Sequence, residues 1–177
     1  YPQYKLAIFP YSSAIEAKNL EIELVHCHAL ATMSLASIFA AKTLGLPLIG
    51  TFHTMIPLTT RYLTPNKKAQ EILSSAAWKA IKALYTPFDV VTAPSHCIAK
   101  LLKQHGVRNV KVISNGIETD KFNTTVSGAK TRRQIGVKKG EKLFLYVGRV
   151  SEEKNVDVVV KAFANLKHRN AKLAIVG

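Results

Sequence analysis

Two cations five residues apart are the residues of this chain whose types and spacing most clearly suggest chemistry. Arg149 and Lys154 lie in the stretch 148–155, after an apolar run at 142–147 typical of a strand and before a run at 156–167 typical of a helix. In open α/β folds such a loop lies at the ligand-binding edge of the sheet. A guanidinium fork, an ammonium group and a helix N-terminus together suit a phosphate or diphosphate. The alternative is a solvated turn whose charges serve solubility.

Polar side chains also follow the other strand-like runs. His26 and His28 close one such run, His53 and Thr54 the next, and Ser95 a third. A histidine in this position can donate to a phosphate or orient a sugar hydroxyl, and a core histidine with satisfied partners is the alternative for His53. His26 and His28 are on alternate strand positions and could share a metal, but no further ligand at suitable spacing accompanies them, so we predict no metal site. Capping of the next helix accounts for Ser95.

The elements that must position these residues alternate between short strands and helices. Such alternation predicts parallel strands joined by right-handed crossovers, and therefore an α/β fold of Rossmann-like parallel sheets with flanking helices. Regularity lapses at 115–127, which begins with Asn115 and Gly116, and this stretch is the predicted crossover between a domain at 1–114 and a domain at 128–177. We expect strands at 6–9, 22–27, 48–52, 89–93, 110–113, 142–147 and 173–176, and helices at 32–44, 67–85, 96–105, 130–135 and 156–167.

Composition narrows the class of protein. Of the 177 residues, 47% are hydrophobic and 20% charged, which is the balance of a soluble globular chain. No apolar run reaches the roughly 20 residues that span a bilayer. The chain opens at Tyr1 without an initiator Met, so we take it as an internal piece of a longer protein. Cys27 and Cys97 lie in apolar contexts, which predicts buried, reduced thiols and a cytoplasmic protein.

The net charge of +14 calls for partners of negative charge, namely nucleic acid, anionic lipid headgroups or phosphorylated substrates. Interleaved aromatic residues of a single-strand binding platform are absent from the sequence, so we predict no nucleic-acid partner. The helix at 67–85 carries Lys67, Lys68, Lys79 and Lys82, with Glu71 as its one acidic residue.

This basic helix could lie on an anionic membrane surface, and the alternative is a solvated face over a core-packed helix. Its apolar positions fall into two stripes. We predict one stripe as the core face and the other as an exposed aromatic edge that could reach headgroup depth. The predicted core stripe is Ile72, Leu73, Ala76, Ala80 and Leu84, and the predicted edge is Trp78, Ile81 and Tyr85.

Five short motifs follow one another in the order and spacing of a known family. They are Val-His-Cys-His at 25–28, Gly-Thr-Phe-His-Thr at 50–54, Asp-Val-Val-Thr-Ala-Pro-Ser at 89–95, Val-Ile-Ser-Asn-Gly-Ile-Glu at 112–118, and Val-Gly-Arg at 147–149 with Glu-Lys-Asn at 153–155. Each is weak alone, but together they cover nearly the whole chain. The chain resembles the retaining GT-B glycosyltransferases of family 4, the glycosyl transferases group 1. The segment after Phe52 further resembles members that glucosylate diacylglycerol or mannosylate phosphatidylinositol.

The resemblance implies two Rossmann-like domains that face a cleft, both incomplete here. Residues 1–114 would be the later part of the N-terminal acceptor domain, and 128–177 the first part of the C-terminal donor domain. Arg149 and Lys154 would bind the donor diphosphate, and His53 would contact the acceptor hydroxyl or the donor sugar. Further candidates are Asn115, Gly116 and Gly148 at the crossover and cleft, and His26, His28, Thr54 and Ser95 on the acceptor side.

The resemblance also implies transfer of a sugar from a nucleotide-diphosphate sugar, with retention and without a metal or other cofactor. We expect a membrane lipid as acceptor and a peripheral location on the cytoplasmic face. The family's glycine-rich loop and its Glu-x7-Glu segment are absent from this sequence, so we expect the piece to be inactive alone. A nucleotide-sugar epimerase of related fold and a non-catalytic basic binding module remain the alternatives.

Overall fold

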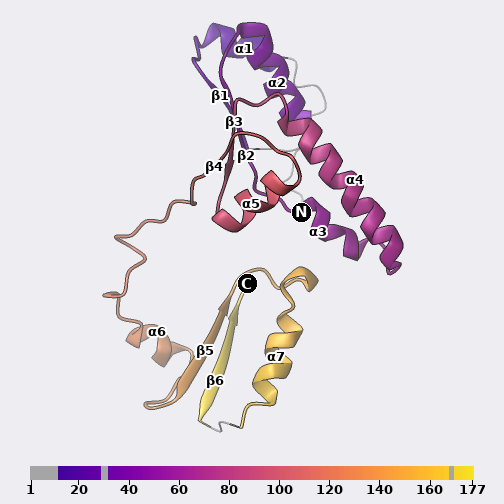
Figure 1. The fold of residues 1–177 in the computed structure, drawn as a ribbon. Coiled ribbons are helices and arrows are strands. Elements are labelled where there is room, and N and C mark those ends of the chain that lie inside the picture. The colour runs from indigo at the N-terminus through magenta and orange to yellow at the C-terminus, as the bar shows by residue number, and fades with distance from the viewer. Residues whose placement is uncertain (1–11, 29–31, 168–169) are drawn as a thin grey trace. The chain divides into compact units, whose positions relative to one another are not determined.

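The structure is a computed structural model that describes residues 12–28, 32–167 and 170–177. The chain divides into two units, unit 1 at 1–116 and unit 2 at 117–177, and each unit has its own parallel sheet (Figure 1). The division falls within the stretch 115–127 that the sequence marks as irregular. The strand expected at 6–9 lies outside the described residues.

Unit 1 alternates strands with helices along the chain. Its elements are α1 (Ser12–Asn19), β1 (Val25–Cys27), α2 (Thr32–Leu44), β2 (Leu48–Thr51), α3 (Ile56–Thr59), the short 3₁₀ helix η1 (Thr60–Tyr62), α4 (Lys67–Tyr85), β3 (Val90–Ala93), α5 (His96–Gln104) and β4 (Val110–Val112).

The sheet of unit 1 runs in the order β1-β2-β3-β4, and every neighbouring pair is parallel. Because the strand order follows the chain, right-handed crossovers place α2, α4 and α5 on one face of the sheet. The core is on that face, where Leu48 and Val91 pack with Tyr85 of α4 and Leu102 of α5. Side chains at the alternate strand positions therefore project from the opposite face.

Gly50, in the middle of β2, explains how Tyr85 reaches the sheet. A Cβ at this position would lie 2.8 Å from a ring atom of Phe88 and 2.9 Å from one of Tyr85. With no side chain on Gly50, the Tyr85 ring fits against the strand, and its hydroxyl donates a hydrogen bond to the Thr51 carbonyl at 3.2 Å. Burial, with a smaller contribution from Cys27, raises the pKa of Tyr85 to about 12.

The predicted orientation of α4 is wrong. Ile81 and Tyr85 are 3% and 4% exposed and belong to the core, whereas Ile72 is 69% exposed. Both stripes have helical spacing, so periodicity alone does not choose between them. The stripe with the larger side chains is buried because Gly50 leaves room for an aromatic ring. The expected exposed edge of Trp78, Ile81 and Tyr85 is thus corrected: Trp78 is half-buried and the other two are core residues.

Unit 2 contains α6 (Ala129–Gln134), β5 (Lys142–Val147), the 3₁₀ helix η2 (Glu152–Lys154), α7 (Val156–Ala164) and β6 (Ala171–Val176). The strands β5 and β6 pair in parallel over their full length, from Lys142 with Ala171 to Val147 with Val176. Phe144 and Phe163 meet edge to face, with ring centroids 5.8 Å apart, and so join β5 to α7.

Most predicted elements are confirmed, three of them at the predicted bounds: the helices at 32–44 and 67–85 and the strand at 142–147. The strand predicted from residue 22 begins only at Val25, because Glu21 has a left-handed φ of 50° and the chain turns before pairing. The helix expected to reach residue 167 ends at Ala164. Cys27 is buried as predicted, but Cys97 is exposed, since the second position of α5 faces away from the core.

Candidate active site

The loop between β5 and α7, which we call the cation loop (148–155), is held by its first residue. Gly148 has a φ of 153°, and its N–H donates to the Val176 carbonyl at 2.9 Å. A Cβ at Gly148 would lie 3.1 Å from the Tyr146 hydroxyl, which donates a 3.0 Å hydrogen bond to the Arg149 carbonyl. The positive φ favours glycine at this position, and the missing side chain leaves room for the Tyr146 hydroxyl.

Within the cation loop, Arg149 and Lys154 contact the same carboxylate. An Arg149 Nη2 lies 3.3 Å from Glu153 Oε2, and Lys154 Nζ lies 3.6 Å from Glu153 Oε1. All three side chains are exposed, and exposed ion pairs of this kind contribute only about 0–1 kcal/mol. An anion of higher charge could therefore take the place of Glu153 between the two cations at little cost. The sequence pattern indicates a role for the two cations but none for Glu153.

The loop ends at the N-terminus of α7. Asn155 has a left-handed φ of 49° and caps the helix through its backbone, without a side-chain hydrogen bond. The Ser151 hydroxyl oxygen is buried and has no hydrogen-bond partner among the described residues. The loop thus combines two cations with the first turn of a helix, the combination that binds phosphate groups in α/β proteins.

In unit 1 three predicted residues, His26, His28 and His53, meet on the sheet face opposite the core. Thr51 and Thr92, which were not predicted, lie beside them, and we call the five residues together the histidine row. The Nε2 of His26 lies 2.8 Å from the Thr51 hydroxyl, which lies 2.7 Å from the Thr92 hydroxyl. The Nδ1 of His28 lies 3.0 Å from the Nε2 of His53.

The rings of the histidine row also contact one another. His26 and His28 have centroids 4.0 Å apart, and His28 and His53 are stacked at 5.3 Å. Partial burial, and then the charges of His28 and His53, lower the pKa of His26 from its ordinary value. Among the described residues no group of His, Cys, Asp or Glu is arranged to hold a metal ion.

The remaining predicted residues have simpler positions. Ser95 caps α5, as predicted, with its hydroxyl accepting the Ile98 N–H at 3.3 Å. Thr54 is exposed directly after His53. Asn115 and Gly116 are exposed, outside regular structure, at the end of unit 1. The structure therefore brings His26 and His28 to His53 but leaves Ser95 in a capping role.

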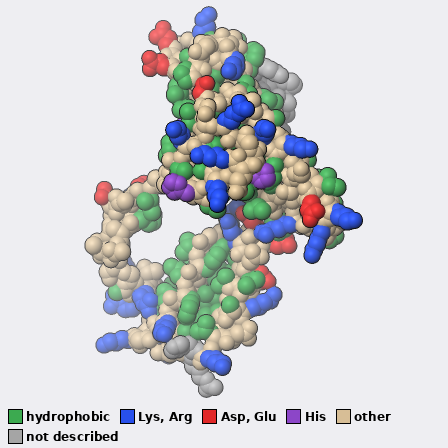
Figure 2. Space-filling view, viewed as in Figure 1, with side chains coloured by type: hydrophobic (Ala, Val, Ile, Leu, Met, Phe, Trp, Pro, Cys, Tyr) green, Lys and Arg blue, Asp and Glu red, His purple; other side chains and the backbone are tan. Residues whose placement is uncertain are grey.

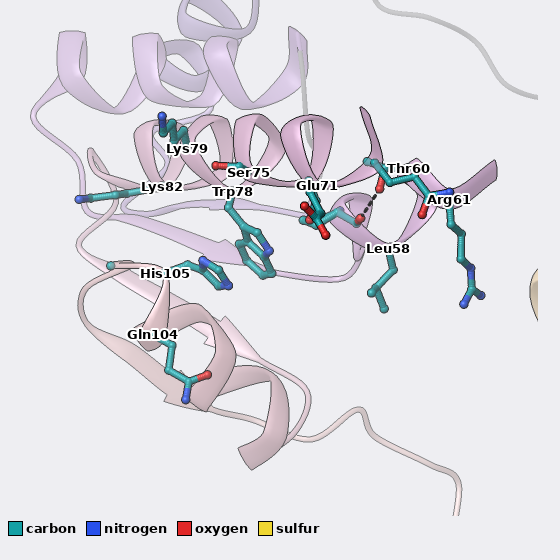
Figure 3. Close-up of a pocket in the computed structure, with 14 residues that line it drawn as sticks. Leu58, Thr60, Arg61, Glu71, Ser75, Trp78, Lys79, Lys82, Gln104 and His105 are labelled. Atoms are coloured by element: carbon teal, nitrogen blue, oxygen red, sulfur yellow. Dashed lines mark hydrogen bonds between the residues drawn. The ribbon is translucent and has the colours of Figure 1, made fainter. Parts of the chain in front are cut away.

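A groove that the sequence analysis missed runs along α4 (Figure 3). It has a volume of about 940 Å³, and its sides come from α3 and η1, from α4, and from the end of α5. Trp78 and His105 stack within it, at 3.9 Å between centroids. Its lining includes the apolar Pro57 and Leu58 and a set of charged residues: Arg61, Glu71, Lys79 and Lys82.

Three of the four charged residues that line this groove are basic, namely Arg61, Lys79 and Lys82. On the face in view in Figure 2, the Lys and Arg side chains of unit 1 outnumber its Asp and Glu side chains. Large apolar side chains are exposed nearby on α3, after η1 and on α4, namely Leu58, Leu63 and Ile72. None of the described helices is both long and apolar enough to cross a membrane.

Solved structures share this fold. A sucrose-phosphate synthase from Thermosynechococcus elongatus superposes with a TM-score of 0.68 at 20% identity, over 96% of this chain and 40% of that one. A glycosyltransferase from Rickettsia africae gives 0.66 at 20% identity, over 99% of this chain and 46% of that one. These similarities define the class of fold, which is that of the GT-B glycosyltransferases.

Two family models match the chain in succession. Residues 2–121 match Glycosyltransferase Family 4, and residues 128–177 match Glycosyl transferases group 1. The chain belongs to glycosyltransferase family 4, and the resemblance drawn from the five motifs is confirmed.

Curated relatives cover most of this chain. An alpha-monoglucosyldiacylglycerol synthase from Streptococcus pneumoniae is 30% identical over 94% of the chain, and a sulfoquinovosyl transferase from Arabidopsis thaliana is 23% identical over 92%. A D-inositol 3-phosphate glycosyltransferase from Nocardiopsis dassonvillei is 29% identical over 85%. The chain spans 38%, 31% and 35% of the lengths of these three proteins.

Proposed function

We propose that the intact protein transfers a sugar from a nucleotide-diphosphate sugar to a lipid acceptor, with retention at the anomeric carbon. The observation that carries this proposal is the convergence of Arg149 and Lys154 on one carboxylate at the N-terminus of α7, in a chain that belongs to glycosyltransferase family 4. Family membership favours transfer over the epimerase and over the non-catalytic basic module.

The donor diphosphate would replace Glu153 between the two cations. Loss of the nucleoside diphosphate leaves positive charge on the sugar and adds negative charge to the departing group. Arg149 and Lys154 stabilise that developing negative charge, which is the task that a divalent cation performs elsewhere. The transfer step accordingly needs no metal ion or other cofactor.

His53 would act on the acceptor side. It is exposed at the carboxyl end of β2, while Phe52 beside it is buried in the core and fixes the backbone. An imidazole held in this way can orient an acceptor hydroxyl toward the anomeric carbon, and alignment of this kind supplies a large part of enzymatic rate enhancement.

The lipid acceptor is favoured by the surface of unit 1. The name of the pneumococcal relative specifies diacylglycerol, and the groove along α4 combines apolar residues with lysines. Lys67, Lys68, Lys79 and Lys82 would contact anionic headgroups, each contributing about 1 kcal/mol. The exposed Leu58, Leu63 and Ile72 would supply apolar contact in place of the buried Tyr85. We also propose that the intact protein acts at the cytoplasmic face of a membrane.

A soluble acceptor is the second candidate, because the relative from Nocardiopsis is named for D-inositol 3-phosphate. The experiment incubates the intact protein with UDP-glucose, UDP-galactose, GDP-glucose or GDP-mannose. Each donor is offered with diacylglycerol in anionic vesicles or with D-inositol 3-phosphate in solution. Glycolipid formation supports the proposal, and NMR of the product reports the anomeric configuration. If glycosylated inositol phosphate is the one product, the acceptor is soluble and the proposed lipid acceptor is wrong. Absence of transfer from every donor would contradict the proposed glycosyltransferase activity.

A further inference from the structure

The ends of β1 and β2 join two histidines that are 25 residues apart in sequence. The register pairs Val25 with Leu48 and Cys27 with Gly50. His28 follows β1 and His53 follows β2, so the two histidines leave adjacent parallel strands at the same edge of the sheet. Cys27 and Phe52 point into the core and fix the two backbones. Both histidines therefore project from the opposite sheet face, with His28 Nδ1 3.0 Å from His53 Nε2.

This contact couples the states of the two rings. In a hydrogen bond between two imidazoles one nitrogen donates and the other accepts, so the tautomer of one ring determines that of the other. The contact uses Nε2 of His53, so Nδ1 is the nitrogen of His53 that does not contact His28. The identity of the free nitrogen decides which atom of His53 a substrate hydroxyl can meet.

The His28 ring is itself held in place. It packs on His26 at 4.0 Å between centroids, and His26 is joined through the Thr51 hydroxyl to the buried Thr92. A chain of contacts thus runs from the interior of the sheet to the exposed His53. Supporting contacts of this kind limit the rotation of a functional side chain and reduce the cost of orienting it at each turnover.

We propose that His28 is a positioning residue for His53: it fixes the ring so that Nδ1 of His53 faces the acceptor hydroxyl. This inference rests on the proposed role of His53 in transfer. It assigns to His28 no contact with the substrate, and therefore predicts that its effect on the reaction depends on His53 being present.

The test uses the intact protein with diacylglycerol vesicles and UDP-glucose as the donor. If another of the donors named above gives turnover, the test is repeated with that donor. We expect His28→Phe, which keeps a ring against His26 but has no nitrogen, to lower kcat about tenfold with the donor KM within twofold. His28→Asn, which can place a polar atom near the position of Nδ1, should restore most of the rate. In a His53→Ala background, His28→Phe should have no further effect.

A second readout does not depend on turnover. In protein labelled with ¹⁵N-histidine, the His53 ring should show one dominant tautomer in the wild type and a mixture in His28→Phe. Wild-type kcat and an unchanged His53 tautomer in His28→Phe would overturn the inference, as would an equal loss in the His53→Ala background. If His53→Ala itself keeps wild-type turnover, the proposed role of His53 fails instead, and the tautomer measurement alone then decides whether His28 orients the ring.

Discussion

Trp78 and His105 lie face to face, with ring centroids 3.9 Å apart and planes only 4° from parallel. The stack joins the middle of α4 to the end of α5, and both residues line the groove (Figure 3). Lys79 follows Trp78 directly, and Lys82 lies one turn further along the helix. These two lysines therefore lie at the groove beside a contact that joins two elements.

Membrane attachment should depend on these lysines. We expect the intact protein to float with vesicles that contain anionic lipid and to dissociate as salt is raised, because screening weakens attraction between exposed charges. Lys79→Glu with Lys82→Glu should weaken the binding, whereas the same change at Lys138 and Lys139 of unit 2 should leave it nearly intact. Equal binding to neutral and anionic vesicles would favour a soluble acceptor.

Removal of either loop cation should impair transfer. Each charge-assisted contact with a diphosphate contributes roughly 1.5–3 kcal/mol, so Arg149→Ala and Lys154→Ala should each lower kcat/KM by about 10- to 150-fold. Lys161→Ala is the matched control, because Lys161 is an exposed lysine of α7 paired with Asp157 at 2.9 Å. Steady-state kinetics with a varied donor concentration measure the effect. Wild-type values for both loop variants would rule out the assignment of the diphosphate site.

Transfer should proceed without a divalent cation. Arg149 and Lys154 are available for the diphosphate, so turnover in excess EDTA should match turnover in the presence of Mg²⁺. The comparison requires protein that has been dialysed against chelator beforehand. Loss of activity in EDTA that Mg²⁺ or Mn²⁺ restores would show that the two cations do not suffice.

Gly50→Ala should destabilise unit 1. The added methyl group would meet the rings of Phe88 and Tyr85 at less than 3.0 Å, and overpacking of this kind costs about 1–3 kcal/mol. Gly116→Ala is the control, since a Cβ there has no neighbour within 4 Å. Urea unfolding followed by Trp78 fluorescence reports on unit 1. An unchanged unfolding midpoint for Gly50→Ala would show that the rings move aside without cost.

Stability should fall on mild acidification in a way that depends on His26. The folded state lowers the pKa of His26 below its ordinary value of 6.5, so near that pH the unfolded chain binds the proton more readily. The free energy of unfolding therefore decreases as pH falls from 6.5 toward the lower pKa of the folded protein, and this contribution vanishes above about pH 7.5. Urea unfolding from pH 5 to 8 should give a flatter dependence for His26→Gln. Identical pH dependences would contradict the prediction.

Much of the secondary structure could be predicted because its signals are local. The helix at 67–85 is capped by Asn66, whose side chain accepts the Ala69 N–H, and α2 is followed by Gly45 with a left-handed φ of 65°. Sequence pattern could not decide which apolar stripe of α4 is buried. That choice depends on Gly50, which belongs to a different element and makes room for the Tyr85 ring.

The candidate site shows the same limit. Arg149, Lys154 and His53 are candidates because their residue types and positions after strands suggest chemistry. Their partners could not be identified in this way. The contact of His28 with His53 depends on the register between β1 and β2, and the groove depends on how α4 packs against the end of α5.

The two-stranded sheet of unit 2 has a consequence for the expression of residues 117–177 by themselves. Within the described part of the chain, β5 and β6 pair only with each other, so each strand has one edge along which no described strand pairs. Exposed edges of this kind are templates for strand addition, and the apolar side chains of Leu145, Val147 and Val176 are exposed beside them. Unit 2 expressed by itself would therefore self-associate by adding strands at these edges.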